Sequence, residues 1–215
     1  MVLRAEDSGM KRVPNLHVTL GFAVAALLCG AIPPASAQTI GSTYSSTAAK
    51  DCHVIGKPGE LDGSTTRLCP GKAGLVVLVS EDDLRETVSV GRDRRAAAKE
   101  PAAQTWFGPF NSTTATVEWR EANGKPFAII QRWHLADNAD EDRNGRPIAK
   151  PMLVVTRTPP DPVCHVAYVD VAANPDAREL AHRAADESAR GFQCGKDEVK
   201  VIGASGRAVE LATRR

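Results

Sequence analysis

Apolar and polar residues alternate with the two-residue period of β-strands over much of this chain. The clearest case is residues 113–135, where TTATVEWR and PFAIIQRWHL flank Glu-Ala-Asn-Gly-Lys and predict a β-hairpin. Residues 74–80 (GLVVLVS) form an almost continuous apolar run and predict a strand buried on both faces. Further strands are predicted at residues 52–55, 66–69, 86–90, 152–158, 164–171, 198–202 and 208–211.

The turn of the 113–135 hairpin admits two registers. A two-residue Asn123-Gly124 turn places Phe127 opposite Arg120, whereas a three-residue loop that includes the preceding alanine places Phe127 opposite Trp119. The three-residue loop gathers the large apolar groups on one face. Because strand register follows burial, we favour the three-residue loop.

A long helix is predicted at residues 175–190, directly after the strand at residues 164–171. Asn174 is a suitable N-cap, and Gly191 is suited to end the helix. One face carries small and apolar residues at helical spacing: Ala177, Leu180, Ala181, Ala184, Ser188 and Phe192. The strand and the returning helix cover similar distances, about 26 Å and about 24 Å, so the chain should come back to where the strand began.

Three other segments carry local signals. Residues 92–100 predict a short helix that Pro101 ends. Residues 80–83 predict a capped helical turn, because a serine and an acid lie three residues apart. Residues 136–150 are polar and predict a loop.

Hairpins outnumber strand–helix–strand crossovers in this pattern. The predicted fold is therefore α+β, an antiparallel sheet of about six strands with one long C-terminal helix packed on one face. We expect it to form a single domain over residues 51–215. Residues 38–50 are rich in Ser, Thr and Gly without an apolar period, and they predict a disordered tether.

Residues 1–37 have the layout of a secretory signal peptide. Lys11 and Arg12 precede an apolar run, and the small residues Ala-Ser-Ala end at position 37. The apolar run has about 15 residues, fewer than the roughly 20 that a membrane-spanning helix needs. We therefore expect the mature protein in the periplasm or outside the cell. Its composition resembles that of exported bacterial proteins.

Four cysteines remain after the predicted cleavage: Cys52, Cys69, Cys164 and Cys194. An even number of cysteines in an exported chain predicts disulfides, and four cysteines allow three pairings. We predict the two local pairs, Cys52–Cys69 and Cys164–Cys194. The second pair would join the strand at residues 164–171 to the end of the predicted helix.

The charge balance argues against two classes of partner. The leader holds three of the 27 basic and two of the 26 acidic residues, so the mature chain is formally neutral. Nucleic-acid binding would require a basic face, and binding to a membrane surface would require a cationic amphipathic helix. We therefore expect neither nucleic acid nor a membrane span after cleavage.

One stretch resembles part of a calcium loop. Asp140, Asp142 and Asn144, followed by Gly145, fit the first half of D-x-D-x-N-G. The twelfth position of such a loop should be a glutamate, but it is Pro151 here. Calcium binding at these three residues is therefore an alternative to the favoured interpretation, a solvated turn. The cysteines and histidines offer a second metal hypothesis, which the predicted disulfides weaken.

Motifs for catalysis are absent from the sequence. His134, His165 and His182 are available as bases, but no G-x-S-x-G, S-x-x-K or H-E-x-x-H accompanies them. Asp186 lies four residues after His182 on the predicted helix, which is typical of a surface pair. Asp170 ends a predicted strand, where it is suited to cap backbone groups. A hydrolase would need dispersed catalytic residues.

Aromatic residues are scarce, and three of them gather in one Gly- and Pro-containing segment: Trp106, Phe107 and Phe110. They either cover an edge of the core or anchor a partner, because aromatic residues are enriched at interfaces. We predict an exported, non-enzymatic module that binds a protein or an envelope component through loops such as this one. The alternatives are a hydrolase with dispersed catalytic residues and a metal-binding exported protein.

Overall fold

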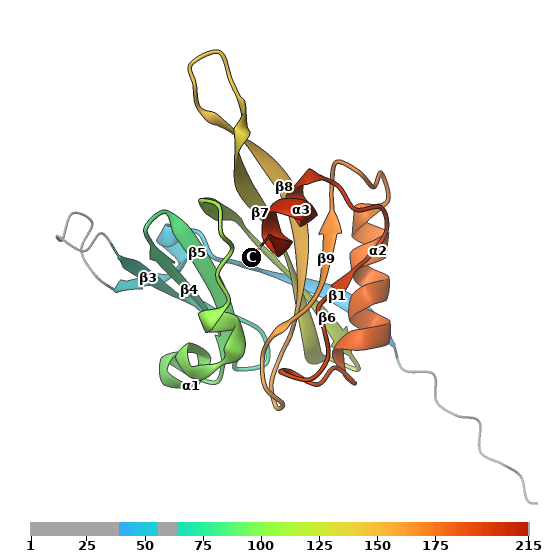
Figure 1. Cartoon of the computed structure of the whole chain (residues 1–215). Coiled ribbons are helices and arrows are strands. Elements are labelled where there is room, and N and C mark those ends of the chain that lie inside the picture. The colour runs from blue at the N-terminus through green and yellow to red at the C-terminus, as the bar shows by residue number, and fades with distance from the viewer. Residues whose placement is uncertain (1–38, 56–63, 215) are drawn as a thin grey trace, which may run out of the picture. The chain divides into compact units, whose positions relative to one another are not determined.

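A computed structural model describes residues 39–55 and 64–214 of the chain. The predicted signal peptide lies outside the described residues and stays a prediction. The described strands form two sheets (Figure 1).

The larger sheet has six strands in the order β1-β6-β7-β8-β9-β10. Their bounds are β1 Ile40–Ser46, β6 Asn111–Ala122, β7 Lys125–Glu141, β8 Pro147–Arg157, β9 His165–Asp170 and β10 Lys200–Val201. All neighbouring pairs are antiparallel except β9 and β10, which are parallel. This sheet therefore consists mostly of successive hairpins, as the alternating pattern predicts.

The smaller sheet has four antiparallel strands in the order β2-β3-β4-β5. They are β2 His53–Ile55, β3 Thr65–Pro70, β4 Val76–Asp82 and β5 Arg85–Gly91. The predicted buried strand at residues 74–80 is confirmed as β4, an interior strand of this sheet. After β5 the chain forms helix α1 (Arg94–Lys99), whose N-cap Asp93 accepts a hydrogen bond from the Ala96 amide, and the 3₁₀ turn η2 (Pro101–Gln104). The predicted short helix is thereby confirmed.

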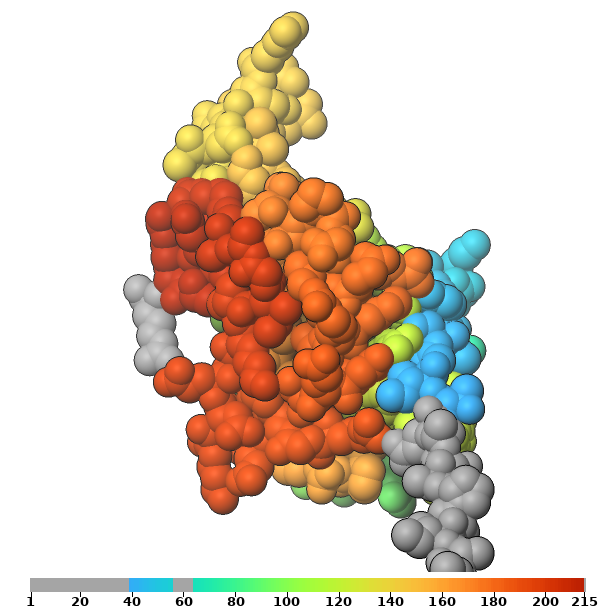
Figure 2. Space-filling view, turned by 90° about the vertical axis from the view of Figure 1, so that its right-hand side faces the viewer, coloured from blue at the N-terminus to red at the C-terminus, as the bar shows by residue number. Residues whose placement is uncertain are grey.

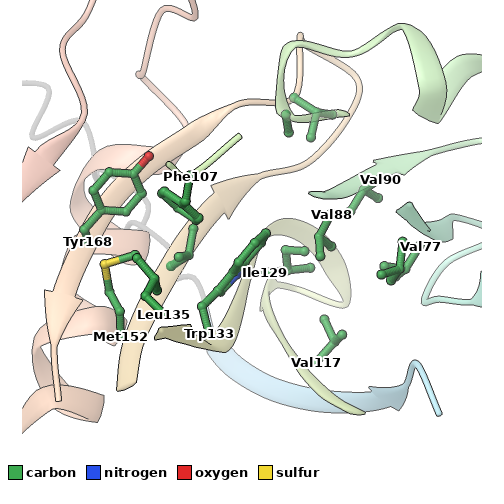
Figure 3. Packing of buried hydrophobic residues seen from close by; sticks show 14 of the residues in the cluster. Val77, Val88, Val90, Phe107, Val117, Ile129, Trp133, Leu135, Met152 and Tyr168 are labelled. Carbon is green, nitrogen blue, oxygen red and sulfur yellow. The ribbon is translucent and has the colours of Figure 1, made fainter. Parts of the chain in front are cut away.

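One hydrophobic cluster draws side chains from both sheets. Val77, Val88 and Val90 come from the smaller sheet, and Ile129 and Trp133 come from β7 of the larger one (Figure 3). Helix α3 (Arg207–Thr213) adds three further apolar side chains to this cluster. The two sheets therefore share a core.

A buried carboxylate also ties the sheets together. Glu86 of β5 accepts a hydrogen bond from the Thr113 amide of β6 at 2.6 Å, and its other oxygen lies 2.5 Å from Arg67 Nη2. Hydrogen bonds of this kind offset the cost of burying a charge.

The opposite face of the larger sheet carries a second cluster under helix α2 (Ala177–Ala184) and the π-helical turn η3 (Ala185–Ala189). The small residues of α2 are buried against the strands, as their spacing predicts. In Figure 1 this helix stands on the side of the larger sheet away from the smaller one.

The predicted α+β fold is wrong. Among the described residues the fold is mostly β, with 46% of them in strands, two sheets and few short helices, and with no long C-terminal helix. The predicted helix is α-helical for eight residues and continues as a π-helical turn. The predicted last strand at residues 208–211 is part of α3. The alternating pattern identifies strands but does not indicate which strands share a sheet. A prediction from this pattern alone therefore places all of them in one sheet.

The predicted disordered tether is also wrong. Residues 40–46 form β1, which pairs with β6 along its whole length. Most of its side-chain contacts are polar: Ser45 Oγ accepts from Trp119 Nε1 at 2.8 Å, and Thr43 Oγ1 donates to Glu121 at 2.8 Å. An edge strand held by its backbone pairing and by hydroxyl groups needs no apolar alternation, so the hydropathy pattern misses it.

The observed hairpin register differs from the favoured one. Ala122 pairs with Lys125 across a two-residue turn, and a bulge between Arg120 and Glu121 then shifts the register. Trp119 therefore pairs with Ile129 and not with Phe127. The bulge turns Phe127 into the cluster under α2 and leaves Trp119 in the core between the sheets.

The predicted polar loop at residues 136–150 is largely strand. β7 runs to Glu141 and β8 begins at Pro147, so the two form an exposed hairpin arm that extends beyond the neighbouring strands (Figures 1 and 2). The predicted helical turn at residues 80–83 is wrong as well, because these residues continue β4 into a hairpin with β5.

Both predicted disulfides are confirmed. Cys52 is bonded to Cys69, which joins the end of β3 to the residue before β2. Cys164 is bonded to Cys194, which joins the residue before β9 to the segment after η3.

Candidate functional site

The structure separates the three aromatic residues that the sequence groups together. The Phe107 side chain is only 2% exposed and packs edge-on against Trp133, with ring centroids 5.0 Å apart. Trp106 and Phe110, in contrast, are 44% and 40% exposed. Phe107 is therefore a core residue, and of the three aromatic side chains only Trp106 and Phe110 are exposed at the surface.

Phe110 lies in a surface groove with a volume of about 320 Å³. Most of its lining comes from three segments: the β4–β5 hairpin, the residues around the start of β6, and the middle of β7; Ala149 of β8 adds to it. We call it the Phe110 groove, and its lining residues include Glu81, Leu84, Phe110, His134 and Ala136.

Backbone hydrogen bonds fix the three segments against one another. The Asn111 amide donates to the Leu84 carbonyl at 2.9 Å, and the Ala136 amide donates to the Phe110 carbonyl at 2.8 Å. Arg85 Nε donates to the Gly108 carbonyl at 2.9 Å, and its guanidinium lies 4.8 Å from the centre of the Phe110 ring. These bonds hold the backbone around the exposed ring, and the guanidinium of Arg85 lies against the ring itself.

Leu84 is the unexpected residue of this groove. It is 60% exposed, although it is a large apolar side chain. Its φ angle is +58°, and that of the preceding Asp83 is +48°, so both central residues of the turn are left-handed. Such turns favour Asn and Gly, and leucine costs about 1–2 kcal/mol there. Leu84 therefore gains neither burial nor a favourable backbone in the isolated protein.

The rim of the groove is acidic. Glu81 lines it and Asp82 is exposed next to it, whereas the neighbouring Asp83 is paired with Arg85. On the opposite wall, burial lowers the pKa of His134, and the nearby charge of Arg132 lowers it further. The imidazole is thus mostly neutral at neutral pH, and the acids dominate the local charge.

A polar layer between α2 and β6 is the second cluster of chemically capable side chains. Asp186 accepts two hydrogen bonds from Arg120, from Nε at 2.9 Å and from Nη2 at 2.7 Å. His182 Nε2 lies 2.7 Å from Oε1 of Glu118. The predicted surface pair of His182 and Asp186 is therefore wrong, because both side chains bind residues of the sheet instead.

This layer is not arranged like a nucleophile and its base. Ser42 Oγ donates to the same Glu118 oxygen at 2.5 Å, so the carboxylate stands between the hydroxyl and the imidazole. In a catalytic triad the imidazole stands in the middle. Burial raises the pKa of Glu118, but the bonds from Ser42, Arg178 and His182 outweigh it and lower the pKa. A carboxylate held ionised in this way suits a structural clamp better than proton transfer.

The candidate calcium ligands do not converge. Asp142 Oδ1 accepts from the backbone amides of Asn144 and Arg146, at 2.8 and 3.0 Å, and Asp140 is paired with Lys150. These contacts close the tip of the arm. Among the described residues, no group of three or more His, Cys, Asp or Glu side chains is placed to hold a metal ion.

Asp170 has the capping role that its position predicts. Its carboxylate accepts from the Ala173 amide and from the Ala208 amide, both at 2.9 Å. Asn174, predicted as a helix cap, binds the backbone of Ala204 instead, and α2 begins only at Ala177. Both residues position α3 and the C-terminal segment and do not form a site.

His165 is buried in the aromatic core. Its Nδ1 lies 2.9 Å from the Tyr168 hydroxyl, and its Nε2 has no partner among the described residues. Burial lowers the pKa of His165 to about 4. The neutral imidazole is therefore the form that the fold accepts.

We expect this histidine to make the protein sensitive to acid. The unfolded chain takes up a proton near pH 6.5 but the folded protein only near pH 4, so stability falls as the pH drops through this window. The slope should be at most about 1.4 kcal/mol per pH unit. Urea unfolding between pH 7 and pH 4 measures it. Y168F should keep this contribution and H165F/Y168F should lose it, whereas equal slopes in the two variants would show that His165 titrates normally.

No family model, curated protein or solved structure matches this chain. No helix in the described part of the chain is long and apolar enough to cross a membrane.

The sequence pattern singles out Phe110 as a candidate but not Leu84, which lines the same groove. The available signal was a leucine among charged residues in Glu-Asp-Asp-Leu-Arg, which is an unusual place for a large apolar side chain.

Proposed function

We propose that this protein is an exported, non-enzymatic binding module that captures a partner protein through the Phe110 groove. The observation that carries the proposal is Leu84, which is exposed and held at a positive φ angle beside an exposed phenylalanine. Strained backbone conformations that no packing contact compensates are found at functional sites. A partner that buries the Leu84 side chain would supply the missing packing contacts.

The geometry favours an apolar anchor from the partner. Burying one large apolar side chain contributes about 1.5–3 kcal/mol, and interfaces concentrate their energy in such anchors. Because Glu81 and Asp82 stand at the rim, a basic residue next to the anchor would add favourable electrostatics. The partner we expect is therefore a protein segment that combines a bulky apolar residue with lysine or arginine.

The features that indicate export give a second argument for the proposal. The two disulfides fit an oxidising compartment, and the leader has the features of a signal peptide.

Site-specific photocrosslinking tests the proposal in the cells that make the protein. We expect p-benzoylphenylalanine at position 84 or 110 to give the same defined adduct, identified by its peptides as a protein. The control is the same probe at Val54, an exposed apolar residue of β2. Identical adducts at all three positions, or none at positions 84 and 110, would refute docking at the groove.

A further inference from the structure

A second candidate site lies at the start of β7, away from the Phe110 groove. Two neighbouring cavities, of about 350 and about 500 Å³, share Lys125, Pro126, Pro159 and Pro160. The two cavities therefore adjoin each other, and we call them together the Lys125 cleft. Lys125 and His134 are separated by about 30 Å along the strand, so the two sites are distinct.

Positive charge collects in the Lys125 cleft. Four cations line it, Lys125, Arg92, Arg157 and Arg190, against a single acid, Asp161. Asp161 is paired with Arg157 at 2.7 Å. Neither Lys125 nor Arg92 has a side-chain hydrogen bond or ion pair with any described residue. Because the mature chain is formally neutral, this excess is local and attracts anions.

Buried polar groups in the walls support a ligand. The Arg157 side chain is 7% exposed, and its Nε has no partner among the described residues. The hydroxyl of the adjacent Thr158 likewise has none in the described part of the chain. Buried donors without partners are rare and call for an explanation. Both atoms lie in residues that line the cleft, where an added acceptor would be nearest to them.

The apolar part of the cleft restricts the ligand further. The Phe127 ring lines it, with the Arg190 guanidinium 5.1 Å from the ring centre, and two proline rings stand nearby. Cavities of this size are typical of small-molecule sites. Guanidinium groups match the planar oxygens of carboxylates and the oxygens of phosphates.

We propose that the Lys125 cleft binds a small organic anion, a carboxylate or phosphate attached to an apolar body. Lys125 and Arg92 contact the acid group, and Phe127 with the two prolines contacts the body. This site is independent of protein docking at the Phe110 groove.

Titration of the disulfide-bonded protein followed by amide NMR tests this site. The probes are phenyl phosphate, benzoate and the neutral benzyl alcohol. We expect saturable shifts with at least one anion, confined to amides near residues 73–75, 122–127 and 158–161, and none with benzyl alcohol. The anion that binds tighter identifies the acid group.

Variants separate a built site from general charge attraction. K125Q/R92Q should weaken binding of the preferred anion at least fivefold, whereas R183Q, on the exposed side of α2, should leave it unchanged. Both variants should keep the wild-type amide spectrum, because these side chains are exposed. Equal binding of benzyl alcohol, no saturation by 10 mM anion, or equal loss in R183Q would each overturn the proposal. None of these results bears on the Phe110 groove.

Discussion

Trp119→Ala is expected to lower the free energy of unfolding by about 3–5 kcal/mol. The indole is fully buried in the core that the two sheets share, and its Nε1 donates to Ser45 Oγ of the edge strand. Gly71 comes so close that a Cβ there would lie 2.7 Å from the ring. Removing the ring therefore leaves a cavity and an unpaired hydroxyl, and it loosens both sheets together.

Urea unfolding monitored by far-ultraviolet circular dichroism measures this loss. V54A, at an exposed position of β2, should change stability by less than about 0.5 kcal/mol. A loss in Trp119→Ala no larger than that of V54A would mean that the sheets do not share this core.

Removing the Cys164–Cys194 disulfide is expected to cost about 3.5 kcal/mol in the loop-entropy model. The bond closes a loop with a sequence separation of 30 and joins the start of β9 to the segment after η3. It thereby anchors the helical layer to the larger sheet. C164A/C194A should therefore be much less stable than wild type and open α2 more readily.

Hydrogen exchange by mass spectrometry locates the effect, and urea unfolding measures its size. C52A/C69A is the matched variant, because its loop has a separation of 17 and should cost about 3 kcal/mol. We expect faster exchange in α2 only for C164A/C194A. Unchanged stability, or faster α2 exchange in both variants alike, would contradict the anchoring role.

Much of the fold follows from local pattern. The β6–β7 hairpin, the buried strand β4, the short helix α1 and both disulfides can be predicted, because each depends on neighbouring residues or on a short loop. The failures have long-range causes. β1 is held by backbone pairing and hydroxyl contacts to β6, a distant segment of the chain. The separation into two sheets depends on where the chain turns after β5, which no local period records.

The hairpin register shows how a local rule fails when a bulge intervenes. Burial of Trp119 and Phe127 on one face would require the favoured loop, but the chain buries them on opposite faces of the larger sheet. Because there is a hydrophobic cluster on each face of the larger sheet, both side chains are buried. A prediction that assumes one core cannot choose this solution.

The candidate site was predictable only in part. Phe107 and Phe110 share one sequence context, yet Phe107 is buried against Trp133 and Phe110 is exposed. The sequence pattern does not indicate an exposed hairpin turn at Leu84, because Ser80 and the following acids resemble a helix cap. Its importance rests on a backbone angle, and no residue pattern shows that angle.

Glycine at position 84 gives the most direct test of the docking proposal. Glycine tolerates a positive φ angle, so Leu84→Gly should make the free protein about 0.5–1 kcal/mol more stable in urea unfolding. The same change should weaken binding of the crosslinked partner, measured by calorimetry, by about tenfold or more, because it removes an apolar anchor. Greater stability with weaker binding is the result we predict. Lower stability with unchanged affinity would show that Leu84 serves the fold and that the partner binds elsewhere.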